Sequence, residues 1–279
     1  MKKRLLSALC AVMLLICTVP MASAQTGDAA RRADALTVLH ILAEEPDRDL
    51  TAPATRAQAA VLLVRLAGGE KTPDTDGWFA GFRDVPDWAR TAANYANRRG
   101  WISGVSNVQF DPNGHLNADA WCAMLLRMLG YKDEDVGGVW PDSYMAEAAL
   151  IGLTDGVSGT GNEGLTRGQA AKLFLNLLRA DQKEGGSYLA TLGETRTGQM
   201  LVSSTADGPR GAGTALQMAS GAVYSLADGK VSNGMLNGTK GTLLLSKNGN
   251  EALTFVPDSV GSSKVVVLST AKATELTDT

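Results

Sequence analysis

The sequence predicts a mainly α N-terminal module of three helix-loop-helix repeats, followed by a small β-rich C-terminal module. Three observations predict this division. Apolar residues recur at helical spacing in three similar segments between residues 29 and 180. All five tryptophans lie before residue 141, whereas Gly, Ser and Thr dominate from Lys183 onward. The 279 residues are also enough for two modest domains, each with its own core.

The first 24 residues have the pattern of a secretory signal peptide. Lys2-Lys3-Arg4 is basic, Leu5–Val19 is apolar and uncharged, and Ala22-Ser23-Ala24 is typical of a cleavage site. The apolar stretch is too short for a comfortable membrane span. We therefore expect residues 1–24 to be removed and the mature protein to be secreted.

The composition excludes several classes of function. The chain has two His and three Cys, and two of those Cys lie in the signal peptide, so we expect no metal, no cofactor and no disulfide framework. The remaining Cys122 lies in an apolar helical pattern, which favours burial as a small hydrophobic residue. The net charge is −3, and the mature chain has no basic run longer than two residues. Such an acidic chain is a poor nucleic-acid binder.

The three repeats, at residues 25–70, 71–132 and 133–182, end in similar helices. Each helix begins with a good capping residue and continues for about three turns with one apolar face. Because one such unit cannot bury its apolar face alone, we expect the three to pack together. A shorter helix and a Gly-, Asp- or Asn-rich loop precede each of them. The final helices are expected at Thr55–Leu66, Asn117–Leu129 and Thr166–Leu178, and the shorter ones around Arg31–Ile41, Asp87–Arg99 and Ser143–Leu150.

Motifs within these repeats resemble the S-layer homology (SLH) family. The family pattern reads F-x-D-V, W-A, a G-x-x-x-G loop, F-x-P-N and T-R-A-E. The matching segments are Phe82–Ala89, Gly100–Gly104, Phe110–Asn113, and, for T-R-A-E, Thr55–Gln58 and Thr166–Gln169, while Trp140-Pro141-Asp142 stands where F-x-D-V would open the third repeat. The resemblance covers about 150 residues. It implies a pseudo-threefold module that holds exported bacterial proteins non-covalently on an anionic, often pyruvylated, secondary cell-wall polysaccharide.

Arg56 and Arg167 are the leading candidates for contact with that polysaccharide. An Arg in the first turn of a helix is repelled by the helix dipole, at a cost of a few tenths of a kcal/mol. The position is favourable if an anion binds beside free helix N–H groups. The alternative is that the neighbouring Thr and Gln merely form capping boxes. The second repeat has Ala118 in place of the Arg and an acidic Asp119, so we expect that repeat to be structural.

Five further residues complete the expected polysaccharide site. Asp84 and Asp142 would accept sugar hydroxyls, with capping of the following helix as the alternative. Trp88 would offer a flat apolar face to a sugar, whereas Trp is more often a core residue. Gly100 and Gly104 would let a sugar approach the backbone closely, or would simply close a turn.

The C-terminal module, residues 183–279, resembles no family that we identify. Gln182–Ser187 is polar and contains glycine, which is typical of a linker. Turn pairs such as Asn248-Gly249 separate short strand-like runs. These runs are Gln199–Ser203, Ala222–Leu226, Thr242–Ser246, Ala252–Val256 and Lys264–Ser269.

We therefore expect a protein of the bacterial cell wall or cell surface that binds wall polysaccharide and displays its C-terminal module. One alternative is a structural protein that associates with itself or with other surface proteins, its sugar pockets having decayed. A second is a wall-modifying enzyme with its active centre in the C-terminal module. No G-x-S-x-G, H-E-x-x-H or P-loop pattern is present, so we do not expect an enzyme.

Overall fold

The structure is a computed structural model that describes residues 49–67, 79–158, 164–227 and 237–258. Three expectations lie outside these residues: the signal peptide at 1–24, the first-repeat helix around Arg31–Ile41 and the strand at Lys264–Ser269.

The prediction of a mainly α module followed by only a small β-rich one is wrong. Helices make up 35% of the described residues and strands make up 25%. The strands form one five-stranded sheet that is antiparallel throughout. The β part is thus a major component of the structure, and its central strand β1 alone runs for 15 residues.

The final helices of the three repeats form where their apolar periodicity predicts them. Their N-caps are Thr55, Asn117 and Thr166, and each cap side chain accepts a hydrogen bond from a backbone N–H of the first turn. Trp121 and Phe174 meet edge to face between two of these helices, with ring centroids 5.7 Å apart. The helices of this part are α3 (Arg56–Leu66), α4 (Asp87–Arg98), α5 (Ala118–Met128), α6 (Asp133–Val136), α7 (Asp142–Leu150) and α8 (Arg167–Arg179).

Short backbone contacts join the starts of the three final helices. The residue before each N-cap takes part: the Ala54 N–H donates to the Leu165 carbonyl at 3.0 Å, and the Leu165 N–H donates to the Leu116 carbonyl at 2.8 Å. A bridge between Thr55 and His115 adds a link between the first and second repeats. The N-termini of α3, α5 and α8 therefore meet at one centre, which is how three units share one core.

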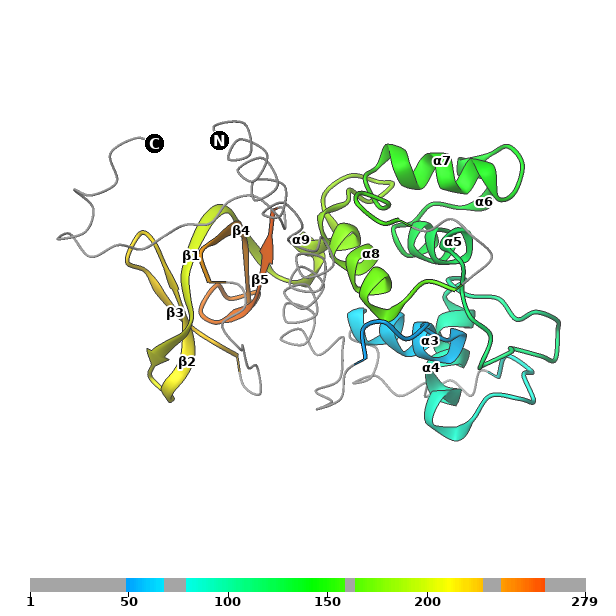
Figure 1. Cartoon of the computed structure of the whole chain (residues 1–279), viewed down its shortest axis with the longest axis horizontal. Coiled ribbons are helices and arrows are strands. Elements are labelled where there is room, and N and C mark those ends of the chain that lie inside the picture. Colours follow the sequence, from blue (N-terminus) through cyan, green and yellow to red (C-terminus); the bar gives the residue numbers. More distant parts are fainter. Residues whose placement is uncertain (1–48, 68–78, 159–163, 228–236, 259–279) are drawn as a thin grey trace, which may run out of the picture.

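The C-terminal part is a small, partly closed barrel. Its strands are β1 (Glu194–Gly208), β2 (Gly211–Met218), β3 (Val223–Ser225), β4 (Thr239–Leu245) and β5 (Ala252–Pro257), in the order β3-β2-β1-β4-β5. A parallel bridge between Leu226 and Ala252 brings the two outer strands together, which curls the sheet (Figure 1). Four of the five expected strands overlap β1, β3, β4 and β5. We did not predict β2, which begins with the weak strand formers Gly211, Ala212 and Gly213.

The segment expected to be a linker is a hydrogen-bonded turn. The Gln182 N–H donates to the Gly186 carbonyl at 2.8 Å, and the Tyr188 N–H reaches back to Ala180 at 3.0 Å. Lys183 fixes this turn to the helical part, through its N–H on the Leu129 carbonyl and its ammonium 3.2 Å from Asp135. The short helix α9 (Tyr188–Leu192) follows and leads into the sheet beside α8 (Figure 1).

Candidate functional site

The first backbone N–H groups of the helices that begin at Arg56 and Arg167 already donate hydrogen bonds to backbone carbonyls. In α3 the N–H groups of Arg56 and Ala57 donate to Gly114 and Pro112, at 2.9 and 3.0 Å. In α8 the N–H groups of Arg167 and Gly168 likewise donate to carbonyls of the first-repeat loop, at 2.8 and 2.9 Å. The capping Thr and its own carbonyl take the next two N–H groups of each helix. The expectation of free helix N–H groups for an anion is therefore wrong at both helices.

The Arg56 side chain ties the first repeat to the second. Its Nε donates to the Phe110 carbonyl at 2.8 Å, and its Nη2 donates to the Ser103 carbonyl at 2.5 Å. The guanidinium also lies over the Phe110 ring, 5.1 Å from the centroid. Burial lowers the pKa of Arg56, but an Arg side chain remains charged at neutral pH even when its pKa is lowered in this way. Arg56 thus has a structural role that sequence reasoning did not foresee.

Asp84 acts on the same loop. Its two carboxylate oxygens accept the N–H groups of Phe110 and Asp111, at 2.8 and 2.9 Å. Burial alone would raise the pKa of Asp84, but these two hydrogen bonds, with the charge of Arg56, hold it below its usual value. The N-cap of α4 is Pro86, without a side-chain bond, so the capping alternative for Asp84 is wrong.

Three other predicted residues belong to three different helices, α8, α4 and α7. The Nε of Arg167 is buried and has no hydrogen-bond partner. Hydrogen bonds from Thr51 are the main cause of the lowered pKa of Asp49, and the charge of Arg167 adds a smaller contribution. Trp88 is 63% exposed near the start of α4. Asp142 is exposed in the first turn of α7 and makes no cap. A polysaccharide role for these three stays a prediction.

The two predicted glycines have different structural reasons. Gly100 has φ +72° and ends α4, and a side chain there would meet no atom within 4 Å. Gly104 is tightly packed, since a Cβ would lie 2.3 Å from Phe82 Cε1 and 2.5 Å from the Gln109 carbonyl oxygen. Gly104 is thus needed for packing of the loop, whereas Gly100 borders open space.

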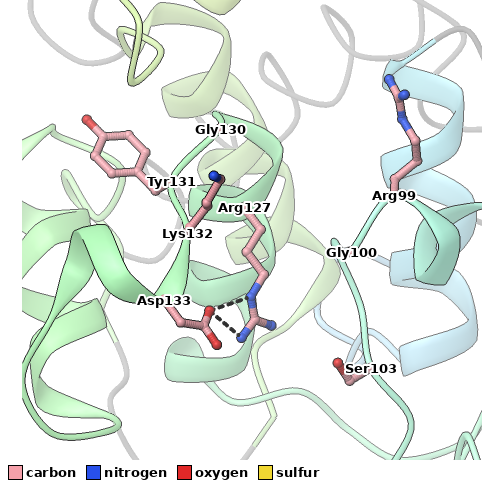
Figure 2. A pocket seen from close by; sticks show the side chains of 8 residues that line it. All are labelled: Arg99, Gly100, Ser103, Arg127, Gly130, Tyr131, Lys132 and Asp133. Atoms are coloured by element: carbon pink, nitrogen blue, oxygen red, sulfur yellow. Dashed lines mark hydrogen bonds and ion pairs between the residues drawn. The ribbon is translucent and has the colours of Figure 1, made fainter.

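That open space belongs to a cavity of about 500 Å³ in the second repeat. One wall is the end of α4 with Gly100 and Ser103, and the other is the end of α5 with the turn into α6 (Figure 2). The lining residues are Arg99, Gly100, Ser103, Arg127, Gly130, Tyr131, Lys132 and Asp133. Sequence reasoning had expected the second repeat to be structural because Ala118 replaces the Arg, and of the lining residues it had named only Gly100. A signal was present in the parallel pairs Gly100-Trp101 and Gly130-Tyr131, each of which ends a helix at a positive-φ glycine.

The cavity carries three cations and one carboxylate. Asp133 accepts two hydrogen bonds from Arg127, at 3.2 and 3.1 Å, which the dashed lines of Figure 2 mark. A hydrogen bond from Tyr144, followed by those from Arg127, lowers the pKa of Asp133 and keeps it ionised. Arg127 is thereby neutralised and fixed in place. Arg99 and Lys132 are the other two cations, and they belong to opposite walls of the cavity (Figure 2).

These two cations differ in how firmly they are held. The Arg99 guanidinium lies 5.5 Å from the Trp101 ring centroid and 5.9 Å from that of Tyr95. Lys132 is three-quarters exposed, and its ammonium is 3.6 Å from the equally exposed Glu134. Exposed pairs of this kind contribute little energy and are easily exchanged. The cavity therefore suits an anionic group with polar neighbours, such as a carboxylated sugar.

No protein-family model matches the chain. It is 35% identical over 133 residues to a cell surface protein of Thermoanaerobacter kivui, a match that covers 47% of this chain and 17% of that protein. It is 31% identical over 132 residues to the middle cell wall protein of Brevibacillus brevis, covering 47% of this chain and 12% of that protein. The chain thus spans less than a fifth of the length of these curated relatives.

These likenesses indicate a cell-wall or cell-surface protein and confirm the location expected from the sequence. Among the described helices, none is both long and apolar enough to cross a membrane. In the same residues, no group of three His, Cys, Asp or Glu side chains could hold a metal ion.

Proposed function

We propose that this protein is held non-covalently at the cell wall by an SLH-like helical module that binds an anionic secondary wall polysaccharide. The observation that carries the proposal is the cavity between the ends of α4 and α5, which Arg99 and Lys132 line from opposite walls. The two curated relatives, both of the cell surface, support the location that this role requires. The role is reversible binding without bond cleavage, and it extends to pyruvylated polymers because a pyruvyl group carries a carboxylate.

The cavity offers each feature that a carboxylated sugar needs. Two cations provide charge-assisted hydrogen bonds to a carboxylate. Ser103 supplies a hydroxyl group for neutral sugar hydroxyls, and Gly100 lets the ligand approach the backbone. Arg56 lies behind the same loop, bonded to the Ser103 carbonyl, so we assign it the positioning of this wall of the cavity rather than ligand contact.

Co-sedimentation with purified walls tests the proposal. The wild-type protein should pellet with native walls and remain soluble with walls stripped of secondary polymer. The double variant Arg99→Gln/Lys132→Gln should bind native walls at least about tenfold more weakly, since it loses both of the cations assigned to the ligand. The control variant Arg90→Gln/Lys240→Gln changes the net charge equally at two exposed sites and should bind like the wild type. Equal binding by all three proteins would remove the cavity from the site.

Self-association is the second candidate, and exposed apolar side chains on the helical part favour it. Trp140 is 53% exposed and Leu150 is 80% exposed, in addition to Trp88. Sedimentation velocity of the purified protein separates the two functions. If the protein stays monomeric at protein concentrations of about 1–100 μM, the range of dissociation constants expected for weak association, this result would argue against self-association.

A further inference from the structure

The third repeat departs from the others where the C-terminal part contacts it. At the tenth position after the N-cap, the first and second repeats have Arg65 and Arg127, whereas the third has Asn176. The helix α8 is also longer, with 13 residues against 11 in both α3 and α5. Its two additional residues include Arg179.

The second and third repeats otherwise have matching geometry at this point. Gly100 ends α4 with φ +72°, and Gly152 follows α7 with φ +76°. The next residue in each repeat, Trp101 or Leu153, donates its N–H back to the helix, at 3.0 and 2.8 Å respectively. In the second repeat this helix end is one wall of the open cavity. The equivalent wall in the third repeat is the loop that begins at Leu153.

In the third repeat, Asn176 spans this space. Its Nδ2 donates to the carbonyls of Leu153 and Asp155, at 2.8 and 3.1 Å. Its Oδ1 accepts from Arg179 Nη2 at 2.7 Å. The Asn176 side chain is only 5% exposed, and both of its polar atoms have partners. A buried amide with all these bonds is a specific and rigid connection.

Arg179 continues the connection into the barrel. Its Nη1 donates to the Pro257 carbonyl at 3.2 Å, and to the carbonyl of Asp258, at the end of β5. One hydrogen-bonded path therefore runs from the third-repeat loop through Asn176 and Arg179 to the last described strand.

We propose that Asn176 and Arg179 form a latch that holds the C-terminal barrel on the third repeat, at the position that is an open cavity in the second. The barrel is thereby fixed to the third repeat and keeps the loop Leu153–Val157 ordered. The C-terminal part is then a fixed element of the wall-binding module rather than freely hinged cargo.

Hydrogen exchange on the full chain tests this proposal. The Asp155 and Val157 amides donate to carbonyls within their own loop. In Arg179→Met these amides should exchange about tenfold faster, although they do not contact Arg179, because Asn176 loses its partner. Amides of α3 should keep their wild-type rates. Arg179→Lys retains the charge but not the forked geometry, and its rates should lie between those of the other two proteins.

Thermal unfolding provides the second measurement. The wild-type protein should unfold in one calorimetric transition, and Arg179→Met in two, since the latch joins the two parts into one cooperative unit. The control Arg90→Met removes an exposed Arg that also bonds a carbonyl and an Asp, and it should preserve both the single transition and the loop exchange rates. Wild-type exchange at Asp155 and Val157 in Arg179→Met, with a single unshifted transition, would overturn the proposal.

Discussion

Arg56 and Asp84 bind the two backbone groups of the same residue: Arg56 donates to the carbonyl of Phe110, and Asp84 accepts its N–H. The two side chains come from different repeats, and Phe110 is fully buried beneath them. A cation and an anion therefore fix the loop that connects α4 to α5. This loop carries Ser103, so the pair also determines the shape of one cavity wall.

Replacing Arg56 should destabilise the fold more than it affects ligand contact. In Arg56→Ala the carbonyls of Phe110 and Ser103 lose their donors, and we expect a loss of about 1–3 kcal/mol in the free energy of unfolding. Urea denaturation measures this loss, with the exposed Arg83→Ala as the control. If Arg56→Ala kept full stability but no longer bound native walls, Arg56 would contact the ligand directly.

Asp84 should make the stability of the protein depend on pH in the acid range. Its pKa is lower in the folded state than in the unfolded state, so its contribution is present above the unfolded value of about 4 and is lost as the pH falls through the folded value. The Asp84→Asn variant should be less stable at pH 7 and should show a weaker pH dependence below about pH 4. Urea midpoints from pH 7 down to pH 2 provide the comparison. Parallel curves for the two proteins would contradict this role.

The two predicted glycines should respond differently to substitution. Gly104→Ala places a methyl group against Phe82 and two carbonyl oxygens, so we expect a loss of about 1–3 kcal/mol. Gly100→Ala meets no atom but requires a left-handed backbone, which costs about 1 kcal/mol. Gly100→Asn should recover part of that cost, because Asn tolerates this conformation. A larger loss at Gly100 than at Gly104 would show that the loop moves to accept the methyl group.

Cys122 should be chemically inert in the folded protein. Burial, together with the charge of Asp119, raises the pKa of its thiol to about 12, so almost no thiolate exists at neutral pH. Maleimide labelling at pH 7.5, followed by peptide mapping, should modify Cys122 only after denaturant is added. Rapid labelling of the native protein would mean that α5 opens under native conditions.

Trp88 should matter little for stability, because most of its side chain is exposed. We expect Trp88→Ala to change the free energy of unfolding by no more than about 0.5 kcal/mol. If Trp88 contacts a sugar, the same variant should bind native walls more weakly, as co-sedimentation would show. Trp101→Ala is the contrasting variant, since Trp101 is buried and its loss should cost about 3–5 kcal/mol.

Local chemistry explains where prediction from the sequence succeeded. Thr55 and Gln58 form a capping box within four residues, as do Thr166 and Gln169, and both boxes are present in the structure. Cys122 is buried, as its helical pattern predicts. Prediction failed for β2, since its first residues resemble a loop. It also failed for the fold class, because each short strand pattern is a weak signal beside the regular helical pattern of the repeats.

The sequence by itself determined the helix starts, the apolar faces of α3, α5 and α8, and the location at the cell surface. Tertiary structure alone decided what each polar side chain does. Arg56 finds its partners 47 and 54 residues away, and they take up the bonds that local reasoning had left for an anion. Arg99 and Lys132 likewise line one cavity only because packing brings the ends of α4 and α5 to its two walls. Helix caps depend on contacts within one turn, whereas a binding cavity depends on which helix ends the packing of the core brings together.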